Sequence, residues 1–296
     1  MATPPRKIRP FEVMVSRVIR ETPDTVTLVF FTGNERLDYK AGQFLNIAPQ
    51  QFPALGRFTA YLEDLKKRKE QPRAYSIASA PHEPFIAITV KEEHYVSGVT
   101  PFPPLLSPLL AHGLQTGAKM TVTGFTGAYV LPDDAESQTN HIVHLVAGSG
   151  VVPNFSILKE DLRQGHTLRH TMIFSNKTWA DITYRDELHV LARDFPERFT
   201  LVHTLTREND PAYFTLGADP HVKVRKGRIS TELITEFVPD PQSALFYVCG
   251  PAITAWERRK ALETKIPSEP RFLERTLEQL HALGVDLKAR VKRESW

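Results

Sequence analysis

Cysteine is nearly absent from this sequence, since Cys249 is the only one among 296 residues. One thiol excludes an internal disulfide framework, and it also excludes an iron–sulfur cluster held by four cysteines of this chain. We therefore expect no iron–sulfur domain here.

A strong charge of one sign and long apolar runs are also missing. The 37 Lys and Arg residues stand against 34 Asp and Glu residues, and the formal charge of +3 is too small to indicate a nucleic-acid partner. Residues 1–11 contain no apolar stretch typical of a signal peptide, and no later run is long enough for a membrane span. We expect a soluble, cytoplasmic, monomeric protein with neither a nucleic-acid nor a membrane partner.

The eleven histidines show no spacing typical of metal ligands, and no His-Glu-x-x-His motif occurs. His141 and His144 are expected on opposite faces of one strand, and His166 and His170 flank a loop. We predict no metal site and interpret all the histidines as structural or solvent-facing.

A strand, a glycine turn and a helix are indicated near the middle of the chain. Residues 141–147 form a short β-branched run, typical of a buried parallel strand. Gly148, Ser149 and Gly150 predict a tight turn, and Pro153 suits the first turn of a helix. A helix N-terminus at the carboxyl end of a parallel strand favours an anion such as a phosphate. A plain turn between packed elements is the alternative interpretation of this motif alone.

The residues before this motif predict an antiparallel β-barrel or sandwich, because short strands and turns predominate. Strands are expected over residues 11–19, 25–31, 44–47, 74–78, 85–91, 120–123 and 129–131. A charged helix is expected over residues 62–70, and residues 132–139 are interpreted as a polar linker.

After the linker, strands alternate with helices, which predicts a parallel sheet with crossover helices. Further strands are expected over residues 169–174, 199–205, 244–249 and 289–292, and further helices over 184–193, 230–236 and 273–283, the last ended by Gly284. The predicted fold class is a β-barrel domain, residues 1–135, followed by a Rossmann-like α/β domain, residues 136–296.

Two more motifs accompany the glycine turn. One expected strand carries Arg73, Tyr75 and Ser76, which offer a guanidinium suited to phosphate, an aromatic ring and a hydroxyl. A later strand ends in Cys249-Gly250-Pro251. Each motif alone is weak, but together they follow a definite order along the chain.

In that order of motifs the chain resembles the ferredoxin–NADP reductase superfamily, in which an FAD-binding Greek-key barrel precedes an NAD(P)-binding domain. The resemblance extends from about residue 11 to residue 296. Leu106-Ser107-Pro108-Leu109-Leu110 is similar to the Leu-Ser-Pro-x-Leu of bacterial ferredoxin/flavodoxin–NADP reductases, so we expect the closest likeness in that branch.

The resemblance implies roles for residues in both halves. Arg73 would pair with the FAD pyrophosphate, Tyr75 would contact the isoalloxazine ring or the ribityl chain, and Ser76 would lie near flavin N5. Ser107 would bind an FAD phosphate. The nicotinamide nucleotide would bind at the loop of Gly148, Ser149, Gly150 and Pro153, and Cys249, Gly250 and Pro251 would lie beside the nicotinamide ring.

The last residues add two expectations by the same resemblance. Trp296 would stack on the flavin and move aside for nicotinamide, as the terminal aromatic residue does in family members. Glu294 would support hydrogen bonding near N5, as in the plastid branch. Ser76, Cys249, Glu294 and Trp296 are thus the expected catalytic residues.

NADP is favoured over NAD as the nucleotide. Ser175 and Lys177 follow the second strand of the nucleotide domain without an acidic neighbour that would repel a 2′-phosphate. Thr206-Arg207-Glu208 and Gly227-Arg228-Ile229 resemble the paired motifs whose arginines bind that phosphate in bacterial reductases.

The expected function is hydride transfer from NADPH to FAD, followed by single-electron transfer to ferredoxin, flavodoxin or another acceptor protein. Acidic acceptors could be steered by the basic residues 66–69, which are otherwise a solvated helix face. Three alternatives stay open: an NADH-using reductase component of an oxygenase, a flavin- and nucleotide-binding redox sensor with poor turnover, and a ferric-siderophore reductase. The insertions at residues 50–71, 209–226 and 257–271 and the unusual loop 95–104 have no assigned role.

Overall fold

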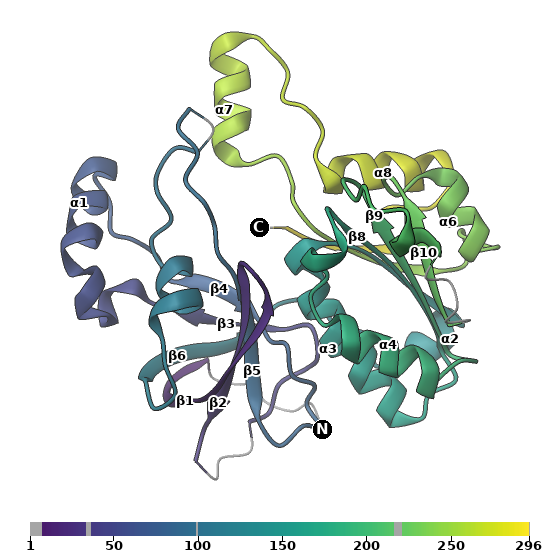
Figure 1. Ribbon diagram of the computed structural model, residues 1–296, viewed down its shortest axis with the longest axis horizontal. Helices are drawn as coiled ribbons and strands as arrows, with labels where there is room; N and C mark the ends of the chain where they lie inside the picture. Colours follow the sequence, from purple (N-terminus) through teal and green to yellow (C-terminus); the bar gives the residue numbers. More distant parts are fainter. Residues whose placement is uncertain (1–7, 34–36, 99, 216–220, 296) are drawn as a thin grey trace. The chain divides into compact units, whose positions relative to one another are not determined.

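The computed structural model describes residues 8–33, 37–98, 100–215 and 221–295 (Figure 1). They fall into two compact units, Met1–Val130 and Leu131–Trp296. Within the described ranges, no helix combines the length and apolar character that a bilayer crossing requires. The domain boundary expected after residue 135 stays a prediction.

The first unit is a six-stranded antiparallel sheet in the order β4-β3-β6-β1-β2-β5. Its strands are β1 (Arg9–Thr22), β2 (Thr25–Phe31), β3 (Phe44–Ile47), β4 (Arg73–Ser76), β5 (Ile86–Lys91) and β6 (Lys119–Thr126). The two outer strands of this order also meet, because Ile77 forms a bridge with Ile88 and the Ala78 N–H donates to the Ala87 carbonyl at 2.7 Å. The sheet therefore closes on itself, which confirms the predicted barrel.

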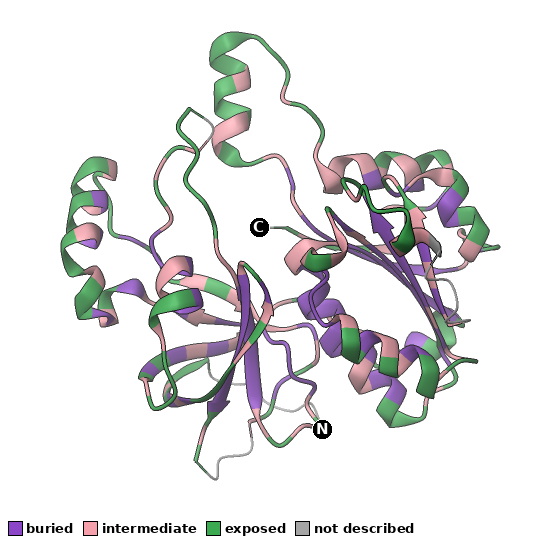
Figure 2. Ribbon diagram, in the orientation of Figure 1, coloured by how far each residue is buried: buried purple, intermediate pink, exposed green. Residues whose placement is uncertain are grey.

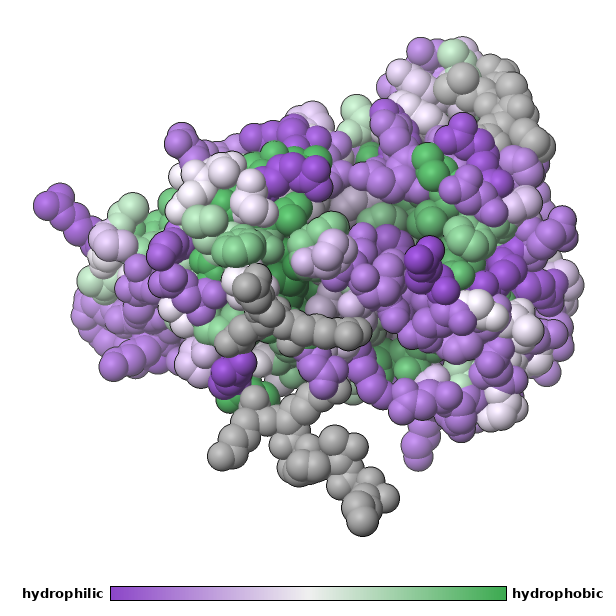
Figure 3. All heavy atoms as spheres, turned by 90° about the horizontal axis from the view of Figure 1, so that it is seen from below, coloured by the Kyte–Doolittle hydropathy of each residue, from purple (hydrophilic) through white to green (hydrophobic). Residues whose placement is uncertain are grey.

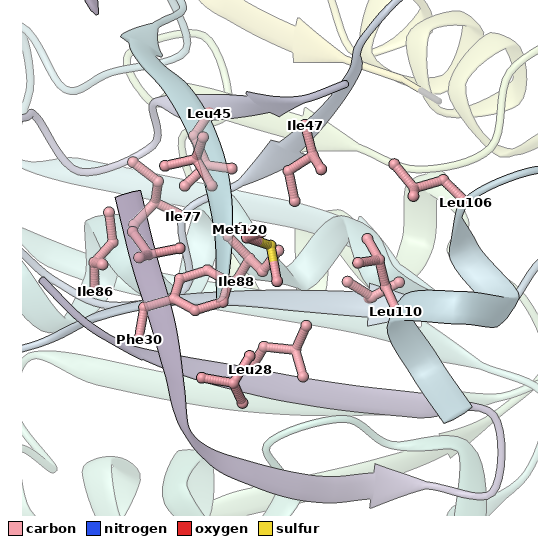
Figure 4. Close-up of a cluster of buried hydrophobic side chains, with 14 of the residues drawn as sticks. Leu28, Phe30, Leu45, Ile47, Ile77, Ile86, Ile88, Leu106, Leu110 and Met120 are labelled. Atoms are coloured by element: carbon pink, nitrogen blue, oxygen red, sulfur yellow. The ribbon is translucent and has the colours of Figure 1, made fainter. Parts of the chain in front are cut away.

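The interior of the barrel is filled by apolar side chains from nearly every strand. Leu28, Phe30, Leu45, Ile88 and Met120 point into this core (Figure 4). β2 and β5 are buried along almost their whole length, whereas β6 alternates between buried and exposed residues. Burial of each large apolar side chain stabilises the fold by about 1.5–3 kcal/mol before entropy is counted.

Two local predictions for this unit are wrong. Residues 129–131 form no strand, although Tyr129 is buried there. The charged helix is α1 (Gly56–Lys66), which begins before residue 62 and ends before residue 70. It ends because Lys67 takes a left-handed conformation, φ 51°, and the N–H groups of Lys67 and Arg68 close the last turn onto earlier carbonyls. Three short helical turns, η1 (Pro49–Gln51), η2 (Pro53–Leu55) and η3 (Leu109–Gly113), complete the unit.

The second unit is a six-stranded parallel sheet in the order β10-β9-β8-β7-β11-β12. This confirms the fold class predicted for this half of the chain, a parallel sheet with crossover helices. Its strands are β7 (His141–Ala147), β8 (Arg169–Asn176), β9 (Phe199–Leu205), β10 (Val222–Lys226), β11 (Leu245–Cys249) and β12 (Val291–Glu294). Helices α3 (Val151–Gln164) and α4 (Arg185–Asp194) cover one face, and α6 (Thr231–Phe237) and α8 (Phe272–Ala282) cover the other (Figure 1). Short elements α2 (Ala135–Gln138), η4 (Gly148–Gly150), η5 (Trp179–Asp181) and α5 (Ala212–Thr215) lie in the connections.

Burial follows this layering. The central strands are buried on both faces, which explains their continuous apolar sequences (Figure 2). Helix α8 ends as predicted before Gly284, whose φ is 75°. Helix α7 (Ala255–Thr264) and strand β10 were not predicted; α7 stands away from the parallel sheet and buries none of its residues (Figures 1 and 2). On the face drawn in Figure 3, hydrophilic residues predominate and apolar residues show only in patches between them.

Candidate functional site

The predicted nucleotide-binding residues gather along one edge of the parallel sheet. Every strand of this sheet ends at the same edge, because all its pairings are parallel. The register places Ala147 beside Ser175 and Cys249 beside both Val146 and Glu294. Segments that lie far apart in the sequence therefore present their residues along a single edge, the usual place for ligands in open α/β sheets.

The glycine turn connects β7 to α3 as predicted. Residues 148–150 form one tight turn of η4, and Gly148 has φ 52°, a left-handed value that side chains disfavour. A Cβ atom added at Gly148 would meet no atom within 4 Å, so the space beside this glycine is open. Pro153 lies buried in the first turn of α3. The turn thus brings a helix N-terminus and open space together, which suits an anionic group.

Three successive loops carry the predicted cations, and backbone hydrogen bonds tie these loops together. The Arg207 N–H donates to the Lys177 carbonyl at 2.8 Å, and the Gly227 N–H donates to the Leu205 carbonyl at 2.9 Å. Lys177, Arg207 and Arg228 are all exposed. Within the described part of the chain, none of these three side chains forms an ion pair or a hydrogen bond.

Glu208 is the acid nearest to these cations in the sequence, but its carboxylate is occupied. It accepts the N–H of Trp179 at 3.0 Å, of Asn209 at 3.0 Å and of Asp210 at 3.1 Å. Hydrogen bonds from these backbone groups, that of Trp179 first, lower the pKa of Glu208. The carboxylate therefore holds the loops together and does not pair with Arg207.

Cys249 and Glu294 face each other in register at the ends of β11 and β12. Burial, and then the charge of Glu294, raise the pKa of the Cys249 thiol, which is 1 % exposed, so the thiol is protonated at neutral pH. Burial raises the pKa of Glu294 to about 7. Its buried Oε2 has no hydrogen-bond partner among the described residues. A carboxyl with a free buried oxygen and a pKa near neutrality can hold or release a proton. Trp296 lies outside the described residues.

Position 250 has to be glycine because another side chain lies very close to its backbone. A Cβ atom at this position would overlap the ring of Phe272 at the start of α8. The backbone of Pro251 is also tied to that helix, since its carbonyl accepts the Leu273 N–H at 3.0 Å. The loop after β11 is therefore fixed by α8, and Phe272 was not identified from the sequence.

In the barrel unit, Arg73 lies in an ion-pair cluster. Its guanidinium donates to Glu70 Oε2 at 2.5 Å and to the Gln71 carbonyl at 2.6 Å, and Lys66 donates to the other Glu70 oxygen at 2.6 Å. Burial raises the pKa of Glu70, but the hydrogen bonds from Lys66 and Arg73 more than offset this and lower it. Arg73 has five N–H donors, so three remain for a phosphate.

The other barrel residues predicted to bind FAD differ in their accessibility. Tyr75 packs partly buried against the barrel core, and burial raises the pKa of its hydroxyl. Ser76 is half-buried and pairs with Phe44 across β3 and β4. Ser107 is 7 % exposed, and its hydroxyl accepts the Glu93 N–H at 3.1 Å, so in this structure it holds the backbone that follows β5.

The basic run at residues 66–69 is less free than the sequence suggests. Lys66 is largely buried by its pairing with Glu70 and by the Phe102 ring, 4.5 Å from its ammonium. Lys67 pairs with Asp64 at 2.8 Å. Steering of an acidic partner here would depend mainly on Arg68 and Lys69.

A buried polar network beside the glycine turn was also missed. It joins Asn154, His144, His170 and Asp161, all at most 1 % exposed. The expected placement of His141 and His144 on opposite strand faces gave no indication of it. The available signal was Asn154 and Asp161, seven residues apart and hence on one face of α3.

Comparison with known proteins agrees with this architecture. Residues 145–255 match the family of the oxidoreductase NAD-binding domain. The ferredoxin reductase component of 3-ketosteroid-9-alpha-monooxygenase from Rhodococcus rhodochrous is 29% identical over 205 residues, which are 68% of this chain and 51% of that protein. The chain thus spans about half the length of this relative.

Two solved structures share the fold over nearly the whole chain. The Flavohem-like FAD/NAD-binding domain of nitric oxide dioxygenase from Vibrio cholerae O1 biovar El Tor has a TM-score of 0.69 at 20% identity, covering 97% of this chain and 99% of that one. Ferredoxin-NADP+ reductase from Plasmodium falciparum has a TM-score of 0.61 at 17% identity, covering 97% and 96%. The chain thus has the fold of these two proteins, as the resemblance to the ferredoxin–NADP reductase superfamily predicted, and residues 145–255 of its parallel-sheet unit match the oxidoreductase NAD-binding domain.

Proposed function

We propose that this chain is an FAD-dependent reductase that takes hydride from NADPH and delivers single electrons to a separate acceptor protein. The observation that carries the choice of NADPH is a set of three exposed cations, Lys177, Arg207 and Arg228, on adjoining loops at the carboxyl edge, whose side chains bond to none of the described residues. A ribose 2′-phosphate is the part of NADP that such cations would bind. The occupied carboxylate of Glu208 is compatible with this role.

The residues present fit the two groups. For the nicotinamide nucleotide, the space beside Gly148 is open, and Glu294 Oε2, which has no partner among the described residues, is free to accept a bond from a ligand. Gly148, Ser149, Gly150, Pro153 and Ser175 would hold the nucleotide, with Cys249, Gly250 and Pro251 beside the nicotinamide. For FAD, the unused Arg73 donors suit the pyrophosphate, and Tyr75, Ser76 and Ser107 would complete the site.

Bound FAD accepts two electrons as hydride and gives them up singly, which nicotinamide does not readily do. The chain orients the nucleotide through its loops, and Glu294 can hold a proton at Oε2 near neutral pH. The Cys249 thiol stays protonated and serves as a small buried group, so no nucleophilic role is proposed for it. The acceptor would be a ferredoxin, a flavodoxin or an oxygenase component.

The test is anaerobic reduction of the purified protein, followed by its visible flavin spectrum, with NADPH and with NADH. NADPH should bleach the spectrum much faster than NADH. The double variant Lys177→Gln, Arg207→Gln should lose about tenfold or more in kcat/KM for NADPH and little for NADH, because only NADPH carries the 2′-phosphate. Arg193→Gln, an exposed arginine in the last turn of α4, at the opposite edge of the sheet, is the matched control.

Preference of the native protein for NADH would contradict the choice of NADPH. It would favour the second candidate, an NADH-using reductase component of an oxygenase. The relative from Rhodococcus rhodochrous is by its name the ferredoxin reductase component of a monooxygenase, which is compatible with this candidate. A protein that binds no FAD on reconstitution would overturn the reductase proposal.

A further inference from the structure

A seam of buried polar groups lies between helix α3 and the parallel sheet. Asn154 and Asp161 stand two turns apart on the side of α3 that faces β7 and β8. His144 of β7 and His170 of β8 lie between them, and their rings stack with centroids 5.3 Å apart. Charged and polar residues are seldom buried this completely unless they are bonded to one another.

One continuous chain of hydrogen bonds runs through this seam and ends at the glycine turn. Asp161 Oδ2 lies 2.8 Å from His170 Nε2, and His170 Nδ1 lies 3.0 Å from His144 Nε2. His144 Nδ1 lies 2.8 Å from Asn154 Oδ1, and Asn154 Nδ2 donates to the Gly150 carbonyl at 2.9 Å. Two strands and a helix are thus linked to a single carbonyl of the turn.

The chemistry of the end groups fixes the donors. The Gly150 carbonyl can only accept, so Asn154 must present Nδ2 to it and Oδ1 to His144, whose Nδ1 must then carry hydrogen. At the far end, Asp161 also accepts from Arg198 at 2.9 Å and from His166 at 2.6 Å, so it is a carboxylate and His170 Nε2 donates to it.

A hydrogen bond between His144 Nε2 and His170 Nδ1 needs one further hydrogen, because the other nitrogen of each ring already carries the hydrogen of the neutral imidazole. With all three bonds made, His144 and His170 share three ring hydrogens and one positive charge. Burial lowers the pKa of both rings, and the hydrogen bond and charge of Asp161 oppose this at His170. At His170 burial outweighs Asp161, so the third hydrogen and its positive charge are disfavoured, and the Asp161 carboxylate is the group that favours them.

The same turn is fixed from its other side. The Val151 N–H donates back to the carbonyls of Gly148 and Ser149. The peptide group between Gly150 and Val151 is therefore bonded at its oxygen by Asn154 and at its nitrogen within the turn. A peptide held at both ends sets the direction of the neighbouring N–H groups at the start of α3.

We propose that Asn154 is a positioning residue of the nucleotide loop, and that His144, His170 and Asp161 hold its amide in the orientation that grips Gly150. Asn154 touches no substrate in this role; it preorganises residues 148–150 for the phosphates. The inference rests on the proposed binding of a nicotinamide nucleotide at this turn.

The decisive variant is Asn154→Asp, which keeps the shape and the acceptor for His144 but removes the donor to Gly150. Binding of NADP+ and NAD+ to the purified flavoprotein would be measured by calorimetry. We expect the Kd of the preferred nucleotide to rise about tenfold, and kcat at saturating nucleotide to change less than about threefold, since the loss is in ground-state binding.

A control separates positioning from stability. His141→Gln removes another buried histidine bond on β7, that to Thr171 Oγ1 at 2.9 Å, which does not reach the turn. This variant should have a lower thermal stability, but its nucleotide Kd should stay within about twofold of the native value, because the hydrogen bonds that hold Gly150 are unchanged. A Kd for Asn154→Asp no larger than that of this control would overturn the proposal.

A second pair of variants covers the case in which Asn154→Asp does not fold. His144→Gln keeps an N–H donor for Asn154 and should retain most of the nucleotide affinity, whereas His144→Leu removes the donor and should lose it. Equal affinities in the two would overturn the proposal. Failure of the native protein to bind either nucleotide would instead refute the proposed function itself, and this inference with it.

Discussion

Two sets of buried polar side chains in the parallel-sheet unit differ in one respect. Below the glycine turn, each ring nitrogen and amide or carboxylate oxygen in the chain from Asp161 to Asn154 has a partner. At the ends of β8 and β12, both amide atoms of Asn176 and the Oε2 of Glu294 have none among the described residues. An unpartnered buried polar atom costs about 1–3 kcal/mol.

This difference indicates that the first set of side chains supports the structure, whereas the second is available to bind a ligand. A saturated network has nothing left to offer a ligand, so its function is to hold other groups in place. Unsaturated atoms at a ligand-binding edge carry a cost that an incoming molecule can relieve. Stability should therefore respond strongly to changes in the first set and weakly, or with a pH dependence, to changes in the second.

The largest effect is expected for Asp161→Asn. The change leaves Arg198, His166 and His170 without their anion, and breaking one partner of a buried ion pair costs about 3–5 kcal/mol. Burial raises the pKa of Asp161, but hydrogen bonds led by that of His170 more than offset this and lower it. The ionised Asp161 carboxylate therefore contributes its full share to the free energy of unfolding above the unfolded pKa of about 3.9. This share is lost as the pH falls through the lower pKa of the folded state.

Chemical denaturation at pH 7 and pH 3 would measure this difference. Asp194→Asn, at an exposed acid that ends α4, should change the free energy of unfolding by less than about 0.5 kcal/mol. Equal losses for the two variants would remove the distinction between the sets.

Glu294→Gln should give a smaller effect that depends on pH. The folded pKa of about 7 lies above the unfolded value, so the native protein loses stability as the pH rises from about 4.3 to about 7. Glutamine does not titrate, so relative to the native protein the variant should gain up to about 3 kcal/mol between pH 4 and pH 8. Denaturant unfolding of the variant and the native protein from about pH 4 to about pH 8 measures this difference, and Glu197→Gln, at an exposed position, is the control. A difference in the free energy of unfolding that does not change with pH would mean that the pKa of Glu294 is not raised.

The smallest effect is expected for Asn176→Leu. Its side-chain amide makes no bond to any described residue, so the free energy of unfolding should change by less than about 1 kcal/mol. Asn154→Leu, the same substitution on a fully bonded amide, should cost about 2 kcal/mol more. Calorimetric unfolding of both variants makes the comparison within one chain, and similar losses would contradict it.

The fold could be predicted from the sequence because its signals are local. Alternation over β6, the apolar run of β7 and the glycine turn each indicate an element without knowledge of its neighbours. The errors occur at the end of α1 and in α7, where the local pattern is weak or a side-chain bond competes with the helix. Glu70 binds Lys66 and Arg73 instead of continuing α1, and α7 has too weak an amphipathic pattern to be found.

The candidate site was predicted in part for the same reason. Lys177, Arg207 and Arg228 follow strand ends, so their common edge is a consequence of parallel order. Phe272 was missed because it packs against Gly250, a residue distant in sequence. Asn154 and Glu70 bond Gly150 and Arg73, only four and three residues away, but polar residues are usually exposed, and only the packed structure shows that these two are buried. The roles of the predicted site residues themselves stay predictions until the experiments above are done.

The packing of Phe272 against Gly250 makes these two positions mutationally interdependent. A side chain at position 250 fits only if position 272 already carries a smaller residue. The substitution at position 272 must therefore come first. Gly250→Ala alone should be harmful, whereas the same change after Phe272→Ala should be tolerated. In a library that randomises position 250 alone, selection should return glycine, and variation at the end of β11 becomes accessible only through the first turn of α8.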